Sequence, residues 1–495
     1  MPENNEKENG KPNGAAETPP LPKEELVTTQ HTVTIDGQEI AYTVTVGTIL
    51  LQDYDEQKPK ASIFFVAYTR DDVDDAARRP ITFSFNGGPG SSSVWLHLGV
   101  LGPRRVLMDP DGNPLPPPYR LVNNEYAILD KSDLVFIDPV STGYSRAVPG
   151  ENADQFHNFE KDIESVGEFI RVYTTRYHRW GSPKFLIGES YGTTRAAGLA
   201  GFLQERHGMY LNGVMLISCI LQFQTARFTP ANDLPFILFL PTYASTAWYH
   251  GQLPPQWQAD LGETLAAVEA FALGDYARAL LLGAEMPASD RQTIAQQLAD
   301  FTGLSPAYIE QTDLRINIHR FVKELLRDQK RTVGRLDSRY LGIDRDAVGE
   351  HMEFDPSYAA IQGPYTATLN DYVRRELKFE SDLPYEILTG KVHPWKFEKH
   401  QNEFLNVGET LRRAMTQNPS LQVFVANGYY DLATPYLATR YTFNHLGLDP
   451  SLQQNIQMTY YGAGHMMYLH LPSLAQLKAD LARFMDRAAF GNTGA

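Results

Sequence analysis

The chain contains a serine whose neighbours could make it a nucleophile. Ser190 stands at the centre of Gly-Glu-Ser-Tyr-Gly (residues 188–192), after the strand-like run 184–187 and before a helix-like run at 193–205. A sharp strand-to-helix turn with small residues on both sides exposes a serine hydroxyl and is known as a nucleophile elbow. The alternative is an ordinary turn in which Ser190 caps the helix. The pattern predicts that Ser190 is a nucleophile.

A serine hydroxyl becomes nucleophilic when a base removes its proton and a third group orients that base. Among the 13 histidines, His465 is well placed, because it follows Gly-Ala-Gly after the last predicted strand, 456–460. Asp431 closely follows the predicted strand 421–425, and its alternative role is to cap a helix. Serine, aspartate and histidine in this order are typical of α/β hydrolases. We predict a triad of Ser190, Asp431 and His465.

A glycine-rich run could stabilise negative charge that develops on a substrate. Asn-Gly-Gly-Pro-Gly at residues 86–90 follows the predicted strand 81–85. A backbone N–H of this turn, together with that of Tyr191, could form an oxyanion hole. Phosphate binding is the competing use, but no Lys-Ser or Lys-Thr pair follows to continue a P-loop.

Four motifs resemble those of the serine carboxypeptidases and occur in that family's order. They are Asn-Gly-Gly-Pro-Gly-Ser-Ser at 86–92, Asp-Pro-Val-Ser-Thr-Gly-Tyr-Ser at 138–145, Gly-Glu-Ser-Tyr at 188–191 and Gly-Ala-Gly-His-Met at 462–466. The resemblance implies an α/β hydrolase that removes one residue from the carboxyl end of a peptide through an acyl-enzyme. The site residues that it implies are the nucleophile Ser190, the base His465, its orienter Asp431, Gly88 and Tyr191 for the oxyanion hole, and Asn86 and Glu189 for the substrate's terminal carboxylate.

Three positions depart from the family's pattern. Ser84 stands where the family has tryptophan, Val100 where it has a second glutamate, and Ser91 where it has cysteine. Because the second acid is absent, a cationic run is another candidate for holding the carboxylate, with a solvated helix face as its alternative role. The run consists of Lys323, Arg327, Lys330, Arg331, Arg335 and Arg339.

The pattern of strands and helices predicts the scaffold that positions these residues. Residues 32–35 and 40–44 alternate around Asp-Gly and predict an antiparallel hairpin. The apolar runs 134–137 and 184–187 are typical of buried parallel strands, with a helix expected at 162–177. We expect an α/β hydrolase fold with a central, mostly parallel sheet and antiparallel strands at its N-terminal side.

We expect four segments along the chain. Residues 1–26 form a disordered polar tail, and residues 27–227 and 383–495 form the two parts of the hydrolase core. Between them, residues 228–382 form a helical cap, because helix-like stretches follow one another there without an alternating strand pattern. Those stretches lie at 261–282, 290–301 and 318–329.

Composition limits the partners and the compartment. The formal net charge of −15 disfavours nucleic acid or an anionic membrane as the main partner. The one cysteine, Cys219, lies in an apolar run as an inert core thiol and favours a reducing compartment. Residues 1–25 lack the apolar region of a signal peptide, and no later stretch has the length of a membrane span. We expect a cytoplasmic protein, or a periplasmic or secreted one if a signal peptide has been removed.

Three classes of function remain open. The first is a serine carboxypeptidase acting on peptides, and the second is an esterase, amidase or acyltransferase with the same triad. The third is a binding protein on a hydrolase scaffold. Prolyl iminopeptidases share the Gly-Gly-Pro-Gly loop, but their loop begins with histidine where this chain has Asn86. We expect neither a metal nor a cofactor, because the sequence has no His-Glu-x-x-His motif and a solitary cysteine.

Overall fold

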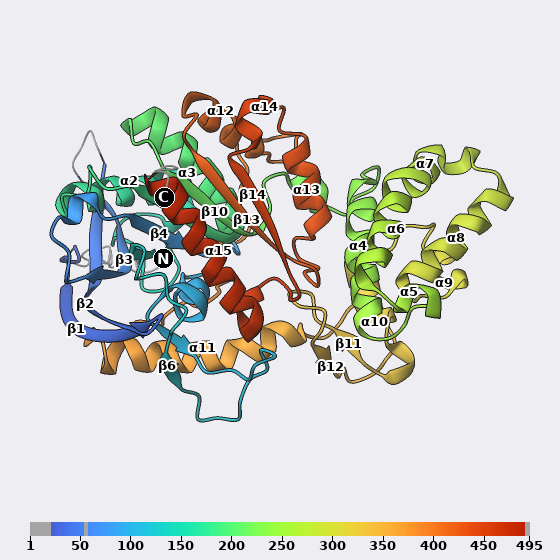
Figure 1. Cartoon of the computed structure of the whole chain (residues 1–495), viewed down its shortest axis with the longest axis horizontal. Coiled ribbons are helices and arrows are strands. Elements are labelled where there is room, and N and C mark those ends of the chain that lie inside the picture. Colours follow the sequence, from blue (N-terminus) through green and yellow to red (C-terminus); the bar gives the residue numbers. More distant parts are fainter. Residues whose placement is uncertain (1–20, 54–57, 491–495) are drawn as a thin grey trace, which may run out of the picture.

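The computed structural model describes residues 21–53 and 58–490, and one large mixed sheet forms its centre (Figure 1). The strand order is β1-β2-β3-β7-β4-β9-β10-β13-β14, with β8 paired to β3. The strands β1, β2, β3 and β7 pair antiparallel, and those from β7 to β14 pair in parallel. The bounds are β1 Leu26–Ile35, β2 Gln38–Gln52, β3 Pro59–Arg70, β4 Ile81–Phe85, β7 Asp133–Ile137, β8 Arg146–Ala147, β9 Lys184–Ser190, β10 Gly213–Cys219, β13 Gln422–Gly428 and β14 Ile456–Tyr461.

This topology confirms the predicted α/β sheet with antiparallel strands at its N-terminal side. The hairpin between β1 and β2 turns at Asp36 and Gly37, whose φ angles of +49° and +77° suit the tight turn that Asp-Gly favours. Most of the expected tail, residues 1–20, lies outside the described residues.

Helices cover both faces of the sheet and bury the apolar residues of its parallel strands. Helices α2 (Phe159–Arg176), α3 (Tyr191–His207) and α12 (Gly408–Gln417) contribute to one core cluster, which includes Val425 of β13. The neighbouring Phe424 belongs to the other cluster, with α11 (Pro356–Arg375) and α15 (Leu471–Phe490). Successive strand residues therefore face opposite layers, as a pleated strand requires.

The segment 228–382 contains two differently packed parts. Its first helices form an arm beside the sheet, with a hydrophobic core of their own (Figure 1). They are α4 Leu234–Tyr249, α5 Pro255–Gln258, α6 Leu261–Phe271, α7 Ala277–Leu282, α8 Ala288–Thr302, α9 Pro306–Gln311 and α10 Ile318–Glu324. A small hairpin of β11 (Thr332–Val333) and β12 (Leu341–Gly342) follows the arm. Helix α11 then packs with the main core, where Tyr365, Leu369 and Tyr372 are buried.

Short elements complete the architecture. They are α1 Val94–Leu96, β5 Arg104–Val106, β6 Leu121–Asn123, α13 Tyr436–Asn444 and α14 Pro450–Gln453. Among the described residues, none of the helices combines the length and the apolar character that crossing a membrane would require. Cys219, at the end of β10, is buried, and burial raises the pKa of its thiol to about 12.

Candidate active site

Ser190 lies at a sharp turn between strand β9 and helix α3. Its φ of +59° and ψ of −128° are strained for a residue with a side chain. The turn is possible because glycines flank the serine. A Cβ on Gly188 would lie 2.0 Å from the carbonyl oxygen of Gly192, and one on Gly192 would lie 2.7 Å from that of Phe85. The backbone at 188–192 therefore has the geometry of a nucleophile elbow.

His465 and Asp431 follow the neighbouring strands β14 and β13 and are hydrogen-bonded to each other. The distance from His465 Nδ1 to Asp431 Oδ2 is 2.7 Å. Asp431 is fully buried, and its Oδ1 accepts the backbone N–H groups of Ala433 and Thr434 at 2.8 and 3.0 Å. The Thr434 hydroxyl donates to Oδ2 at 2.7 Å. These bonds fix the carboxylate in an orientation that points Oδ2 at the imidazole.

The contact with Asp431 determines how the imidazole of His465 can act. With Nδ1–H donating to Asp431, the lone pair of the neutral ring lies on Nε2. Burial alone would lower the pKa of His465, but the charge of Asp431 and its hydrogen bond raise that pKa above its usual value. Ser190 and His465 line the same cavity. The arrangement therefore suits a base that accepts a proton from a serine hydroxyl.

The loop that carries His465 is fixed by the segment that follows the helical arm. The His465 N–H donates to the carbonyl oxygen of Leu336 at 2.6 Å, and the Gly464 N–H donates to Asp337 Oδ2 at 3.0 Å. Asp337 is buried and pairs with Arg339. Residues 336–339 thus hold the backbone at the imidazole and immediately before it.

The glycine-rich loop after β4 lies against the nucleophile turn. A Cβ on Gly87 would lie 2.4 Å from the backbone nitrogen of Tyr191, so only glycine permits this approach. Gly88 has a φ of +103°, which also favours glycine. Tyr191 is the first residue of α3, and the first N–H groups of a helix have no partner within the helix. The loop and the helix end can therefore bind a negatively charged oxygen.

Glu189 is a buried acid beside the nucleophile. Its Oε1 accepts from Asn86 Nδ2 at 3.0 Å, and its Oε2 accepts from the Tyr468 hydroxyl at 2.6 Å. Asn86 is itself held by the Leu96 N–H, which donates to its Oδ1 at 3.1 Å. Burial raises the pKa of Glu189 to about 7, against the opposing influence of His465 and of the two hydrogen bonds. Near neutral pH the side chain exists in both protonation states.

Tyr468 is a member of this cluster that no sequence motif identifies. The sequence gives little indication of its role, because Tyr468 stands three residues after His465 in a stretch without a distinctive motif. A Cβ on Gly99 would lie 2.3 Å from its ring, so glycine makes room for the tyrosine. Val100, the position of the missing acid, is fully buried in the apolar core. The partner of Glu189 here is therefore a hydroxyl and not a second carboxyl group.

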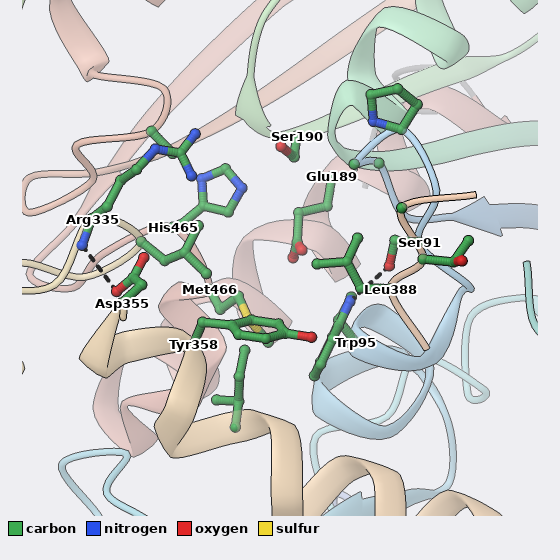
Figure 2. Close-up of a pocket in the computed structure, with 18 of the residues that line it drawn as sticks. Ser91, Trp95, Glu189, Ser190, Arg335, Asp355, Tyr358, Leu388, His465 and Met466 are labelled. Atoms are coloured by element: carbon green, nitrogen blue, oxygen red, sulfur yellow. Dashed lines mark hydrogen bonds between the residues drawn. The ribbon is translucent and has the colours of Figure 1, made fainter. Parts of the chain in front are cut away.

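Ser190, Glu189 and His465 line a cavity of about 450 Å³. In Figure 2, Arg335 and His465 lie on one wall, Trp95 lies on the opposite wall, and Glu189 lies between them. The side chains of Trp95, Tyr358 and Met466 make much of this cavity apolar. The space suits one amino-acid residue with a polar group directed towards Glu189.

Most of the cationic run is away from this cavity. Lys323 pairs with Asp344, Arg327 with Glu324 and Arg339 with Asp337. Lys323, Arg327, Lys330 and Arg331 line a separate small hollow. Arg335 alone of the six lines the cavity beside Ser190. Its backbone N–H donates to Asp355 at 3.1 Å, as the dashed line in Figure 2 marks.

Comparison with known proteins identifies the family. The family model described as serine carboxypeptidase matches residues 51–469, which include every residue of the site described above. The chain belongs to the serine carboxypeptidase family. The resemblance predicted from its four motifs is thereby confirmed.

Individual members of the serine carboxypeptidase family match shorter parts of the sequence. The pheromone-processing carboxypeptidase KEX1 of Saccharomyces cerevisiae is 33% identical over 131 residues, which are 26% of this chain and 17% of the yeast protein. Serine carboxypeptidase-like 33 of Arabidopsis thaliana is 27% identical over 141 residues, 26% of each chain. The matched region thus spans about a sixth to a quarter of these relatives.

The likeness to a solved serine carboxypeptidase structure extends over most of the chain. The crystal structure of the yeast prohormone-processing carboxypeptidase KEX1 aligns with a TM-score of 0.54 at 15% sequence identity, and the alignment covers 90% of this chain and 91% of that one. At this identity the match concerns the fold. It confirms the predicted α/β hydrolase fold.

Proposed function

We propose that the protein is a serine carboxypeptidase that hydrolyses the C-terminal peptide bond of peptides through an acyl-enzyme. Ser190 Oγ attacks the scissile carbonyl carbon while His465 Nε2 accepts its proton, and Asp431 stabilises the imidazolium that forms. The N–H groups of Gly88 and Tyr191 donate to the oxyanion. His465 then protonates the leaving amine, and the terminal residue departs. A water molecule, deprotonated by the same base, hydrolyses the acyl-enzyme.

The observation that carries this proposal is the buried cluster of Glu189, Asn86 and Tyr468 beside Ser190. An esterase or an endopeptidase has no need of an acid with a raised pKa at this place. A carboxyl group that is neutral up to about pH 7 can donate a hydrogen bond to the free carboxylate of a peptide. Asn86 and Glu189 bind this carboxylate in the proposal, and the terminal residue occupies the cavity of about 450 Å³.

The substrates in this proposal are peptides, and the compartment is the cytoplasm. The cytoplasmic location is supported by the cysteine content. Cys219 is the one cysteine of the sequence, and because it is buried it cannot form a disulfide with another chain.

The test is the hydrolysis of an N-blocked dipeptide and of the same compound with its terminal carboxyl group amidated. We expect the acid to be cleaved and the amide to be cleaved far more slowly, because only the acid offers a carboxylate to Glu189. Ser190→Ala is the control for contaminating peptidases. Equal rates for the acid and the amide would contradict carboxypeptidase action and favour an amidase with the same triad.

A further inference from the structure

A second cavity, of about 390 Å³, opens on Ser190 beside the first. Ser190, Gly88 and Arg335 line both cavities, so the nucleophile and the glycine-rich loop lie where the two cavities meet. Glu189 lines only the first. A peptide whose terminal carboxylate lies at Glu189 therefore places its last residue in the first cavity. The side chain of the preceding residue then points into the second.

The second cavity carries positive charge on its wall. Arg227 and Arg335 both line it, and its lining residues include no aspartate or glutamate. Within the described part of the chain, no ion pair within 4 Å joins either guanidinium to a carboxylate. Asp355 accepts a hydrogen bond from the backbone N–H of Arg335 and not from its guanidinium. The Arg227 guanidinium lies 5.4 Å from the centre of the Phe223 ring. Partial desolvation of its guanidinium and the charge of the nearby Arg335 both lower the pKa of Arg227, although the residue as a whole is exposed.

Carboxylates already pair with three cations of the run that contains Arg335. Lys323, Arg327 and Arg339 each have such a partner. The chain as a whole has 15 more acidic than basic charges, so carboxylates are abundant. Two like charges that share a concave site repel each other, and an anion that enters the site relieves this repulsion. A guanidinium also matches the geometry of a carboxylate.

We propose that Arg335 and Arg227 make the second cavity select peptides with glutamate or aspartate immediately before the scissile bond, an inference that rests on the proposed carboxypeptidase function. The aromatic rings of Phe223 and Phe239, which line the cavity, contact the methylene groups of the bound side chain. Its carboxylate pairs with the guanidinium groups. The position of Arg335 on both cavities brings this charge next to Ser190, where an acyl group is attached during the reaction.

The test compares N-blocked dipeptides that share one terminal residue and carry glutamate, glutamine or lysine before it. We expect wild type to cleave the glutamate peptide at least about 10-fold more efficiently, in kcat/KM, than the glutamine peptide. Arg335→Gln should reduce this ratio about 10-fold, and Arg227→Gln should reduce it less, because Arg227 is the more exposed of the two. Arg335→Glu should make the lysine peptide the better substrate. Arg331→Gln, a change outside both cavities, should leave the ratio as in wild type.

A ratio taken within one variant is independent of any general loss of activity, including a loss caused by changing a charge close to His465. A ratio that does not change in Arg335→Gln or Arg227→Gln overturns the inference. The inference is also overturned if Arg335→Gln lowers kcat/KM equally for all three peptides and leaves that of their amides unchanged. Arg335 would then bind the terminal carboxylate. Wild type that cleaves all three equally also overturns it, while the proposed function stands. Wild type that releases no terminal residue from any of them overturns the proposed function itself.

Discussion

Replacing Glu189 by glutamine should remove the pH dependence of substrate binding. In wild type the neutral carboxyl group donates to the substrate's carboxylate, whereas the ionised group repels it. Glutamine has nearly the same shape and can keep both bonds of the cluster, accepting from Asn86 and donating to the Tyr468 hydroxyl oxygen. It carries no charge at any pH. The variant should therefore bind the carboxylate equally well across the pH range.

The magnitude follows from the pKa of about 7 that burial gives Glu189. Two pH units above this value only about 1% of the side chains remain neutral, so the apparent dissociation constant rises about 100-fold if the ionised form does not bind. The same pKa affects folding stability. The folded state holds a proton that the unfolded chain loses near its ordinary pKa of 4.5, so stability falls as pH rises through the interval from 4.5 to about 7. Over that interval the free energy of unfolding of Glu189→Gln should therefore rise by about 3 kcal/mol relative to that of wild type.

The assay is competitive inhibition by an N-blocked amino acid, which resembles the substrate's terminal residue and undergoes no chemistry. Its inhibition constant should be constant below about pH 6 and increase by about 10-fold per pH unit above about pH 7 in wild type. The Glu189→Gln constant should stay level. Urea unfolding of both proteins at about pH 4 and about pH 8 measures the stability difference. If the inhibition constant of wild type does not change with pH and Glu189→Gln leaves it unaltered, Glu189 does not bind the substrate's carboxylate.

Three other substitutions test the remaining parts of the site. Ser190→Ala should reduce kcat on the order of 10⁶-fold, with an unchanged circular dichroism spectrum and no labelling by a fluorophosphonate; retention of a few per cent of activity would exclude Ser190 as the nucleophile. Tyr468→Phe removes a hydrogen bond that lowers the pKa of Glu189, so the inhibition constant should begin to rise at a higher pH than in wild type, and an unshifted profile would contradict the pairing. Gly188→Ala places a Cβ 2.0 Å from the Gly192 carbonyl oxygen and should reduce activity at least about 100-fold and lower the Tm. The control Gly274→Ala, with nothing within 4 Å of the added Cβ, should do neither. Wild-type activity and Tm in Gly188→Ala would contradict the close packing of the turn.

The sheet was predictable because its signals are local. Apolar runs such as 134–137 are buried on both faces, and the Asp-Gly turn at 36–37 identifies a hairpin within a few residues. The helices of segment 228–382 were less predictable from the sequence. The run that opens α4 contains Pro235 near its first turn and Pro241 within it, and α11 contains Pro364. Proline suggests a helix break, but packing of these helices against the arm and the core outweighs that local preference.

The polar contacts of the site required the structure. The Ser-Asp-His order is visible along the chain, but the bond between Tyr468 and Glu189 joins residues 279 positions apart. No local pattern encodes such a pair, because it depends on the space that Gly99 leaves for the ring. Of the cationic run, the sequence indicates six equivalent candidates. Only the fold distinguishes Arg335, which lines the cavities, from the residues that have carboxylate partners.

The bonds between residues 336–339 and the His465 loop divide the helical arm into a root and a tip. At the root, any change in length would shift the backbone that holds His465 through Leu336 and Gly464 through Asp337. At the tip, around α7 and α8, whose buried residues belong to the arm's own core, insertions and deletions leave these bonds intact. An engineer who wishes to graft a new binding surface onto this scaffold should therefore replace loops of the tip and preserve the spacing of the root.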